Sequence, residues 1–171
     1  MALVLQAYTT PANTKVITDT AAPSGSLPTA AVPAPPAVIS PLVDGSIAYI
    51  WSPNDAPNQT VTFQSTFDIG SIPIPTVALP ISVYFAFAAS ETATVSASLE
   101  IVNLFGTVIT TIPLFTGASI DPQNVDISQC DTLLAISLLG ISGRIVVDTT
   151  VSAATSPGRY IGQITVRDFL L

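Results

Sequence analysis

Residues 77–112 decide the fold class, and they read VALPISVYFAFAA-SET-ATVSASLEIV-NLFG-TVITTI. In the first run the apolar residues on one face of an extended strand are Val77, Leu79, Ile81, Val83, Phe85 and Phe87. In the second run an apolar series alternates with polar residues, and it comprises Val95, Ala97, Leu99 and Ile101. Because side chains of a strand point to opposite faces with period two, this stretch predicts a half-buried antiparallel meander.

The same alternation continues on both sides of this meander, with turn sequences rich in Pro, Gly, Asn and Asp between the runs. We expect eight strands, at 46–51, 60–69, 79–89, 92–102, 107–115, 132–139, 144–152 and 159–169. Eight short strands separated by turns are typical of a two-sheet antiparallel β-sandwich. The predicted fold is therefore an all-β, eight-stranded jelly roll.

The first 44 residues have a different composition from the rest. Residues 1–22 begin with a short apolar, strand-like segment, MALVLQAY, and seven of the fifteen prolines fall within the first 41 residues. Proline fixes φ and favours extended backbone, so 23–44 is predicted to be a polyproline-type linker. We expect an extended N-terminal arm at 1–22, this linker, and a jelly-roll domain at 45–171.

Charge excludes several classes of partner. Only 9% of the 171 residues are charged and the formal net charge is −7. Without a basic cluster, neither nucleic acid nor an anionic membrane surface is an expected partner. The longest apolar run, 77–89, is interrupted by Pro80 and Ser82 and is shorter than a membrane-spanning helix requires, about 18 to 20 residues. The N-terminus carries no basic region of a secretory signal peptide.

No catalytic constellation is visible in the sequence, and no cofactor is expected. The chain has no histidine, which removes the commonest general base and zinc ligand. The single Cys130 is expected to be a small, partly buried residue. Asp121, Asp126 and Asp131 recur at five-residue spacing; they are either solvated loop acids or weak candidates for calcium. We therefore expect a protein that is not an enzyme.

Two further features could bind or carry carbohydrate. Tyr49 and Trp51 share one face of a strand, so they form either part of the core or a stacking platform for sugars. Asn58 begins an Asn-Gln-Thr sequence that fits the N-glycosylation motif, although so short a motif arises readily by chance.

This layout resembles the self-assembling, pilin-like subunits of bacterial endospore appendages and related spore-surface jelly rolls. It combines an apolar N-terminal arm, a proline-rich spacer and a Thr/Val/Ala-rich sandwich of low charge. The resemblance implies that the arm of one subunit docks on a neighbour and that the protein works outside the cell or on a spore surface. Better-known members cross-link through several cysteines, whereas this chain has only Cys130.

We accordingly predict a structural subunit that forms a homopolymer by donating its arm to a neighbouring subunit. Strand addition of this kind supplies main-chain hydrogen bonds and pockets for alternate side chains. The expected arm contacts are Leu3 and Leu5 on one face, Val4 on the other, and Tyr8. The alternatives for the protein are a carbohydrate-binding β-sandwich module and a viral or phage coat or decoration protein. The alternative for the arm is a disordered tail or a segment that folds back on its own domain.

Overall fold

The computed structural model describes residues 3–35, 49–70, 77–103, 105–119, 126–136 and 141–168. Within these ranges the secondary-structure elements are all β-strands. Seven long strands are β6 (Gln59–Gly70), β7 (Val77–Ala89), β8 (Ala93–Asn103), β9 (Val108–Ser119), β10 (Asp126–Ile136), β11 (Ile141–Ala153) and β12 (Tyr160–Asp168). Five shorter ones precede them: β1 (Leu3–Tyr8), β2 (Thr14–Asp19), β3 (Thr29–Ala30), β4 (Val32–Pro33) and β5 (Ile50–Trp51). The predicted all-β class is confirmed.

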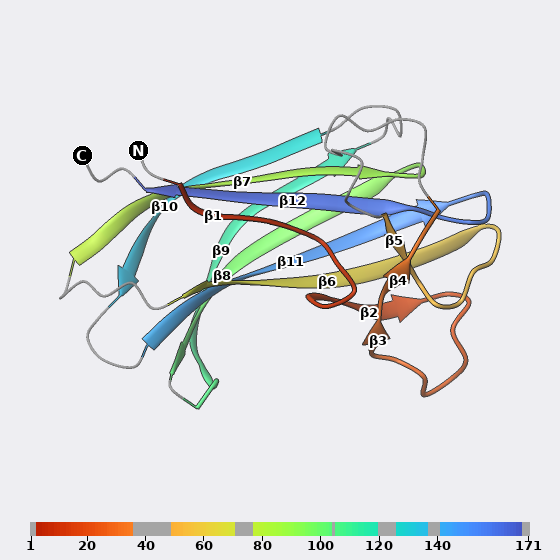
Figure 1. Cartoon of the computed structure of the whole chain (residues 1–171), viewed down its shortest axis with the longest axis horizontal. Coiled ribbons are helices and arrows are strands. Elements are labelled where there is room, and N and C mark those ends of the chain that lie inside the picture. The colour runs from red at the N-terminus through yellow and green to blue at the C-terminus, as the bar shows by residue number, and fades with distance from the viewer. Residues whose placement is uncertain are drawn as a thin grey trace.

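The strands form two antiparallel sheets that pack face to face (Figure 1). Sheet A has the order β10-β7-β12-β5-β4, and β1 also pairs with β12. Sheet B has the order β3-β2-β6-β11-β8-β9. From β6 to β12 the chain passes repeatedly between the sheets, so that strands distant in sequence become neighbours. This is the jelly-roll arrangement. The sheet B strands β6, β11, β8 and β9 face the sheet A strands β10, β7 and β12, together with β1 and β5, which both pair with the same edge of β12.

Several strand boundaries differ from the prediction, and two of them show why. Of the run expected at 46–51, residues 46–48 lie outside the described part of the chain. Ile50 and Trp51 form β5, and β1 pairs with the rest of that edge of β12. The strand expected at 132–139 begins earlier, at Asp126. Its first residues, DISQC, show no alternation of apolar and polar side chains. β10 is an edge strand, and Ile127, the large apolar residue of this run, is 64% exposed on its outer face. A pattern based on burial therefore misses this strand.

The core lies between the two sheets, and its largest members are aromatic. Trp51 packs against Phe63 at 5.6 Å between ring centroids, and Phe63 stacks on Tyr160 at 5.1 Å. All three side chains are at most 2% exposed. Full burial of one large apolar side chain contributes about 1.5–3 kcal/mol, so this cluster is a major source of stability.

Buried hydroxyl groups are paired within this core. The Thr149 and Tyr160 hydroxyls lie 2.8 Å apart and join β11 in sheet B to β12 in sheet A. The Thr14 and Ser65 hydroxyls lie 2.8 Å apart and join β2 to β6. Burial raises the pKa of Tyr160 well above its usual range, which keeps the phenol neutral. Among the described residues no buried side-chain nitrogen or oxygen lacks a partner.

In the described part of the chain, no helix has the length and apolar character needed to cross a membrane.

Candidate functional site

The predicted arm lies on its own body. β1 pairs antiparallel with β12, with Gln6 opposite Thr165 and Ala7 opposite Ile164. Leu5 and Ala7 are partly buried against the core, as their alternation would suggest. A bulge between Leu3 and Leu5 changes the register there. The structure therefore places β1 at the edge of sheet A, held by one neighbouring strand.

The bulge corrects the predicted faces of the arm. The alternation assigns Leu3 and Leu5 to one face and Val4 to the other. In the structure Val4 and Leu5 both pack against the core, whereas Leu3 is 57% exposed opposite Arg167. An extra residue in one strand displaces the pattern by one position, and this cannot be read from apolar spacing. Tyr8 lies opposite Gln163 and is half-buried.

A tight corner carries the chain from β1 in sheet A to β2 in sheet B. The side chain of Asn13 accepts a hydrogen bond from the Thr10 amide at 2.8 Å and donates one to the Tyr8 carbonyl at 2.8 Å. The Thr9 amide donates to the Gly162 carbonyl at 2.9 Å, and the Gly162 amide donates to the Thr9 hydroxyl at 2.8 Å. These bonds attach the corner to both β1 and β12.

The predicted linker also contacts the body over its described part. Its β3 pairs with β2 and its β4 pairs with β5, and Ala31 between them is 2% exposed. Each strand is only two residues long and β4 ends in Pro33, as expected at a sheet edge, where a missing amide donor is tolerated. Residues 3–35 thus lie against the body of the same chain, and residues 36–44 of the linker lie outside the described part.

Asp19 anchors the end of β2 to the body. Its carboxylate accepts hydrogen bonds from the Gln59 amide at 2.7 Å, the Ser52 hydroxyl at 2.5 Å and the Ala21 amide at 2.7 Å. Burial alone raises the pKa of Asp19, but these bonds and a longer one from Asn54 outweigh it, and the pKa is lowered. The ionised carboxylate therefore helps to hold the N-terminal segment in place.

Tyr49 and Trp51 do not form an exposed platform. They are 4% and 2% exposed, and the Trp51 indole donates a 3.0 Å hydrogen bond to the side-chain oxygen of Gln59. The core interpretation of this pair is confirmed, and the sugar-stacking interpretation is wrong for these two residues. The sequence places both aromatic residues on one face of a strand, but it does not show whether that face meets the core or solvent.

The turn between β8 and β9 carries the most exposed large apolar residue of the described chain. Phe105 is 91% exposed, and Ile109 and Val108, which follow it, are 56% and 38% exposed. The Asn103 side chain accepts hydrogen bonds from the amides of Phe105 and Thr107, each at 2.9 Å. We call residues 105–109 the tip. The sequence shows it only as an aromatic residue within a four-residue turn.

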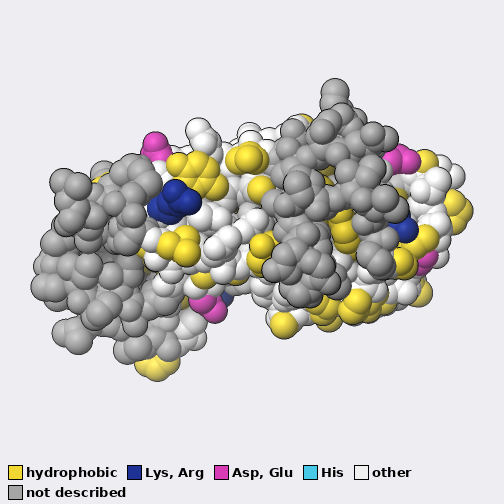
Figure 2. Space-filling model, turned by 45° about the horizontal axis from the view of Figure 1, so that its top comes forward, with side chains coloured by type: hydrophobic (Ala, Val, Ile, Leu, Met, Phe, Trp, Pro, Cys, Tyr) yellow, Lys and Arg dark blue, Asp and Glu magenta, His cyan; other side chains and the backbone are white. Residues whose placement is uncertain are grey.

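The outer face of sheet A is hollowed. A cavity of about 340 Å³ is lined by Tyr84, Ala86, Ile127, Gln163, Thr165 and Arg167. These residues come from three adjacent strands, β7, β10 and β12, and we call this cavity the sheet A hollow. Its lining continues across the strands to Gln6 and Tyr8 of β1, which are the register partners of Thr165 and Gln163. Figure 2, in which the top of Figure 1 comes forward, shows mostly hydrophobic and uncharged groups among the coloured atoms.

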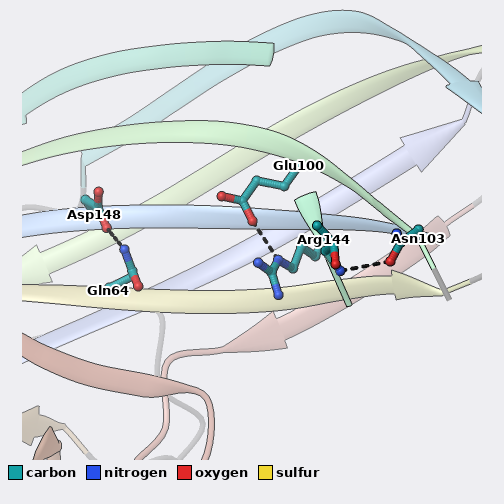
Figure 3. A network of polar contacts seen from close by, with 6 residues as sticks. Gln64, Glu100, Asn103, Arg144 and Asp148 are labelled. Atoms are coloured by element: carbon teal, nitrogen blue, oxygen red, sulfur yellow. Dashed lines mark hydrogen bonds and ion pairs between the residues drawn. The ribbon is translucent and has the colours of Figure 1, made fainter. Parts of the chain in front are cut away.

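The outer face of sheet B is polar by comparison. Arg144 on β11 pairs with Glu100 on β8 at 2.7 Å, and Gln64 on β6 donates to Asp148 on β11 at 3.1 Å (Figure 3). Beside them is a cavity of about 570 Å³ whose charged lining residues are Lys15, Asp68 and Arg144. Within the described lining there is no histidine or cysteine, and Arg144 is already engaged by Glu100.

The remaining candidates are dispersed. Asp121 lies outside the described residues. Asp126 and Asp131 both belong to β10, where five residues of extended chain separate their backbones by about 17 Å, too far to share one calcium ion. Among the described residues, no group of three or more His, Cys, Asp or Glu side chains is placed to hold a metal. Cys130 is half-buried in β10 as predicted, and burial together with the Asp131 charge raises the pKa of its thiol. Asn58 is exposed in a turn at φ 54°.

No protein-family model matches the chain, and no curated protein matches it. Among solved structures, an infectious bursal disease virus (Gx strain) chain is similar at TM-score 0.40 and 13% identity, over 78% of this chain and 36% of that one. A tailspike protein 4 domain of bacteriophage CBA120 is similar at TM-score 0.37 and 10% identity, over 94% of this chain and 20% of that one. A structure described as CBM4 gives TM-score 0.35 and 9% identity, over 72% and 86%. The chain spans 36% to 41% of the length of two such bursal disease virus chains, and at these identities the likeness concerns β-sandwich architecture alone.

Proposed function

We propose that this chain is a structural subunit that assembles with copies of itself into an extracellular filament or surface appendage, and that β1 is exchanged between neighbouring copies. The observation that carries the proposal is the position of β1. It is a six-residue edge strand, held by β12 alone within its sheet, and it contains no charged residue. An uncharged edge strand lacks the usual protection against pairing with another chain.

Exchange of β1 would conserve the contacts that hold it. In a neighbouring copy β1 would meet the same register partners on β12 and the same core residues, so exchange costs little once the corner at 9–13 opens. If each copy gives its strand to the next and the rotation does not close, the product is an open filament. The bonds of Asn13 to Thr10 and Tyr8 are the local barrier to this opening.

A cysteine pair distinguishes exchange from intramolecular docking. Gln6 and Thr165 are register partners, and we would replace both with cysteine in a Cys130→Ser background. Oxidation of assembled protein is expected to give a ladder of covalent multimers on a non-reducing gel. Oxidation of dilute monomer is expected to give a cross-linked single chain.

The matched control is a pair that cannot exchange. Thr62 and Thr150 are register partners on β6 and β11, which are interior strands of sheet B, and their hydroxyls lie 3.0 Å apart. Cysteines there should link only within one chain in any sample. Filaments in which the Gln6–Thr165 pair also links only within one chain would refute strand exchange while leaving self-assembly intact.

The other functions considered from the sequence are separated by the same samples. A coat or decoration subunit would also self-assemble, but electron microscopy would show closed shells or binding to a foreign particle instead of filaments. The carbohydrate-binding alternative loses its proposed platform because Tyr49 and Trp51 are buried. Protein that stays monomeric at all concentrations would overturn the proposed function. Extracellular location and the lack of enzymatic activity are part of the proposal.

A further inference from the structure

The tip is a rigid apolar projection. The amides of Phe105 and Thr107 both donate to the Asn103 side chain, and the Gly106 amide donates to the Asn103 carbonyl at 2.9 Å. Gly106 has φ +76°, a conformation that residues with a side chain rarely adopt. The turn is therefore fixed by hydrogen bonds, with Asn103 drawn in Figure 3, and it holds Phe105 in solvent. Such an exposed aromatic side chain on an ordered turn marks a contact surface.

The sheet A hollow has the chemistry to receive an aromatic side chain. Tyr84, Ala86 and Ile127 supply apolar surface, and Ile127 is 64% exposed. Arg167 is the one charged residue of the lining. A guanidinium beside an aromatic ring is attracted by the negative face of that ring, and Tyr84 offers a second aromatic partner.

We propose that the tip of one copy, led by Phe105, docks into the sheet A hollow of the next copy. The inference rests on the proposed function, since it supplies a second contact between the subunits of the same homopolymer. A second copy is the occupant because the chain itself carries the matching group: Phe105 is 91% exposed, and it fits the apolar surface and the Arg167 guanidinium of the hollow. At a net charge of −7 two copies repel each other, and this contact limits the repulsion because neither the tip nor the lining of the hollow carries a negative charge.

The placement of the two surfaces favours an open chain. In Figure 1 the β8–β9 turn lies at the bottom of the molecule, whereas β7, β12 and β10 lie along its top. A contact between different patches on opposite sides is head-to-tail, so each copy keeps a free tip and a free hollow at the ends. The hollow also adjoins Gln6 and Tyr8 of β1, so the same neighbour could meet both surfaces. A contact between one turn and a cavity of about 340 Å³ should bury little surface, so the contact alone should be weak and should gain strength when exchanged strands tether the subunits.

The experiment isolates this contact from strand exchange. A Cys130→Ser chain with Ala7→Cys and Ile164→Cys, cross-linked within a single molecule, cannot exchange β1. This register pair lies on the core side of the two strands, so the lock leaves Gln6 and Thr165 beside the hollow unchanged. In this locked chain we expect reversible association at high concentration, measured by sedimentation or small-angle scattering as a rise in average mass. Phe105→Ser should abolish the rise, and Ala86→Glu, which fills the hollow and adds a charge, should abolish it as well. Phe105→Tyr keeps the aromatic ring and should retain it.

Mixing the two defective variants gives the decisive result. The Phe105→Ser chain keeps an intact hollow and the Ala86→Glu chain keeps an intact tip, so a mixture can form one contact per pair. We expect each variant alone to be monomeric and the mixture to form dimers but nothing larger. Far-UV circular dichroism and thermal unfolding of each variant would establish that both remain folded.

Three outcomes would overturn the inference. The first is a locked parent chain that stays monomeric at all concentrations, and the second is locked variants that associate as well as their parent. The third is a mixture of two folded, monomeric variants that remains monomeric. In each case intermolecular cross-links in the unlocked chain would still support the proposed function, so failure of the inference can be told from failure of the proposed function.

Discussion

Truncation of Leu5 and of Leu3 should have different effects, because β1 is docked on its own body in the monomer. Removal of a fully buried leucine side chain beyond Cβ costs about 2–5 kcal/mol. Leu5 is half-buried against the core, so Leu5→Ala should cost roughly half of that, about 1–2.5 kcal/mol. Leu3 is 57% exposed, and Leu3→Ala should stay within about 0.5 kcal/mol of the parent.

Thermal unfolding of dilute monomer measures this difference. For a chain of this size, 1 kcal/mol corresponds to about 2–4 °C in Tm, so Leu5→Ala should lower Tm by roughly 2–10 °C. Leu3→Ala serves as the matched control, since it removes the same atoms from the same strand. Equal Tm values for the two variants and the parent would mean that β1 is a free arm in solution. Equal and large losses would mean that the bulge between them is absent.

Three further predictions concern the body. Asp19 has a lowered pKa in the folded state, so its stabilisation is present above the unfolded value of 3.8 and is lost as pH falls through the folded pKa; Asp19→Asn should flatten this part of the stability-versus-pH curve measured by urea unfolding. Gly158→Ala should cost about 1–3 kcal/mol, because the new Cβ would lie 2.2 Å from ring atoms of Trp51, and an unchanged denaturation midpoint would contradict this packing. Trp51 is the single tryptophan and is 2% exposed, so its fluorescence should resist iodide quenching until the chain unfolds and should not respond to added polysaccharide.

The sequence predicts the fold well where one strand face is buried and the other meets water. In β6 the apolar residues Val61, Phe63 and Phe67 are at most 3% exposed, as their alternation indicates. The pattern is less informative at the sheet edges, where burial no longer dictates residue type. β10 begins with a polar run and an outward Ile127, and its start was therefore misplaced.

The candidate site could be predicted only in part. The apolar segment that became β1 is recognisable as a strand, but whether it pairs with its own β12 depends on the edge that the distant residues 160–168 leave open. The bulge at Val4 and the burial of Trp51 are likewise set by neighbours far away in sequence. Phe105 and the sheet A hollow leave almost no signal, because the hollow joins residues of three strands that become adjacent only in the folded sheet.

The antiparallel pairing of β1 with β12 also determines how the sandwich bears tension. Leu3 and Arg167 are register partners at one end of this pair, and Figure 1 shows β1 beside β12. A force that pulls these two positions apart loads the β1–β12 hydrogen bonds one after another, so the bonds should break in sequence at low force. A force applied at opposite ends of the pair, for example at Tyr8 and Arg167, would shear all of these bonds at once and meet greater resistance. In a filament under load, the points of attachment would therefore decide whether β1 detaches from β12 at low or at high force. Single-molecule pulling from the two pairs of positions would measure this difference.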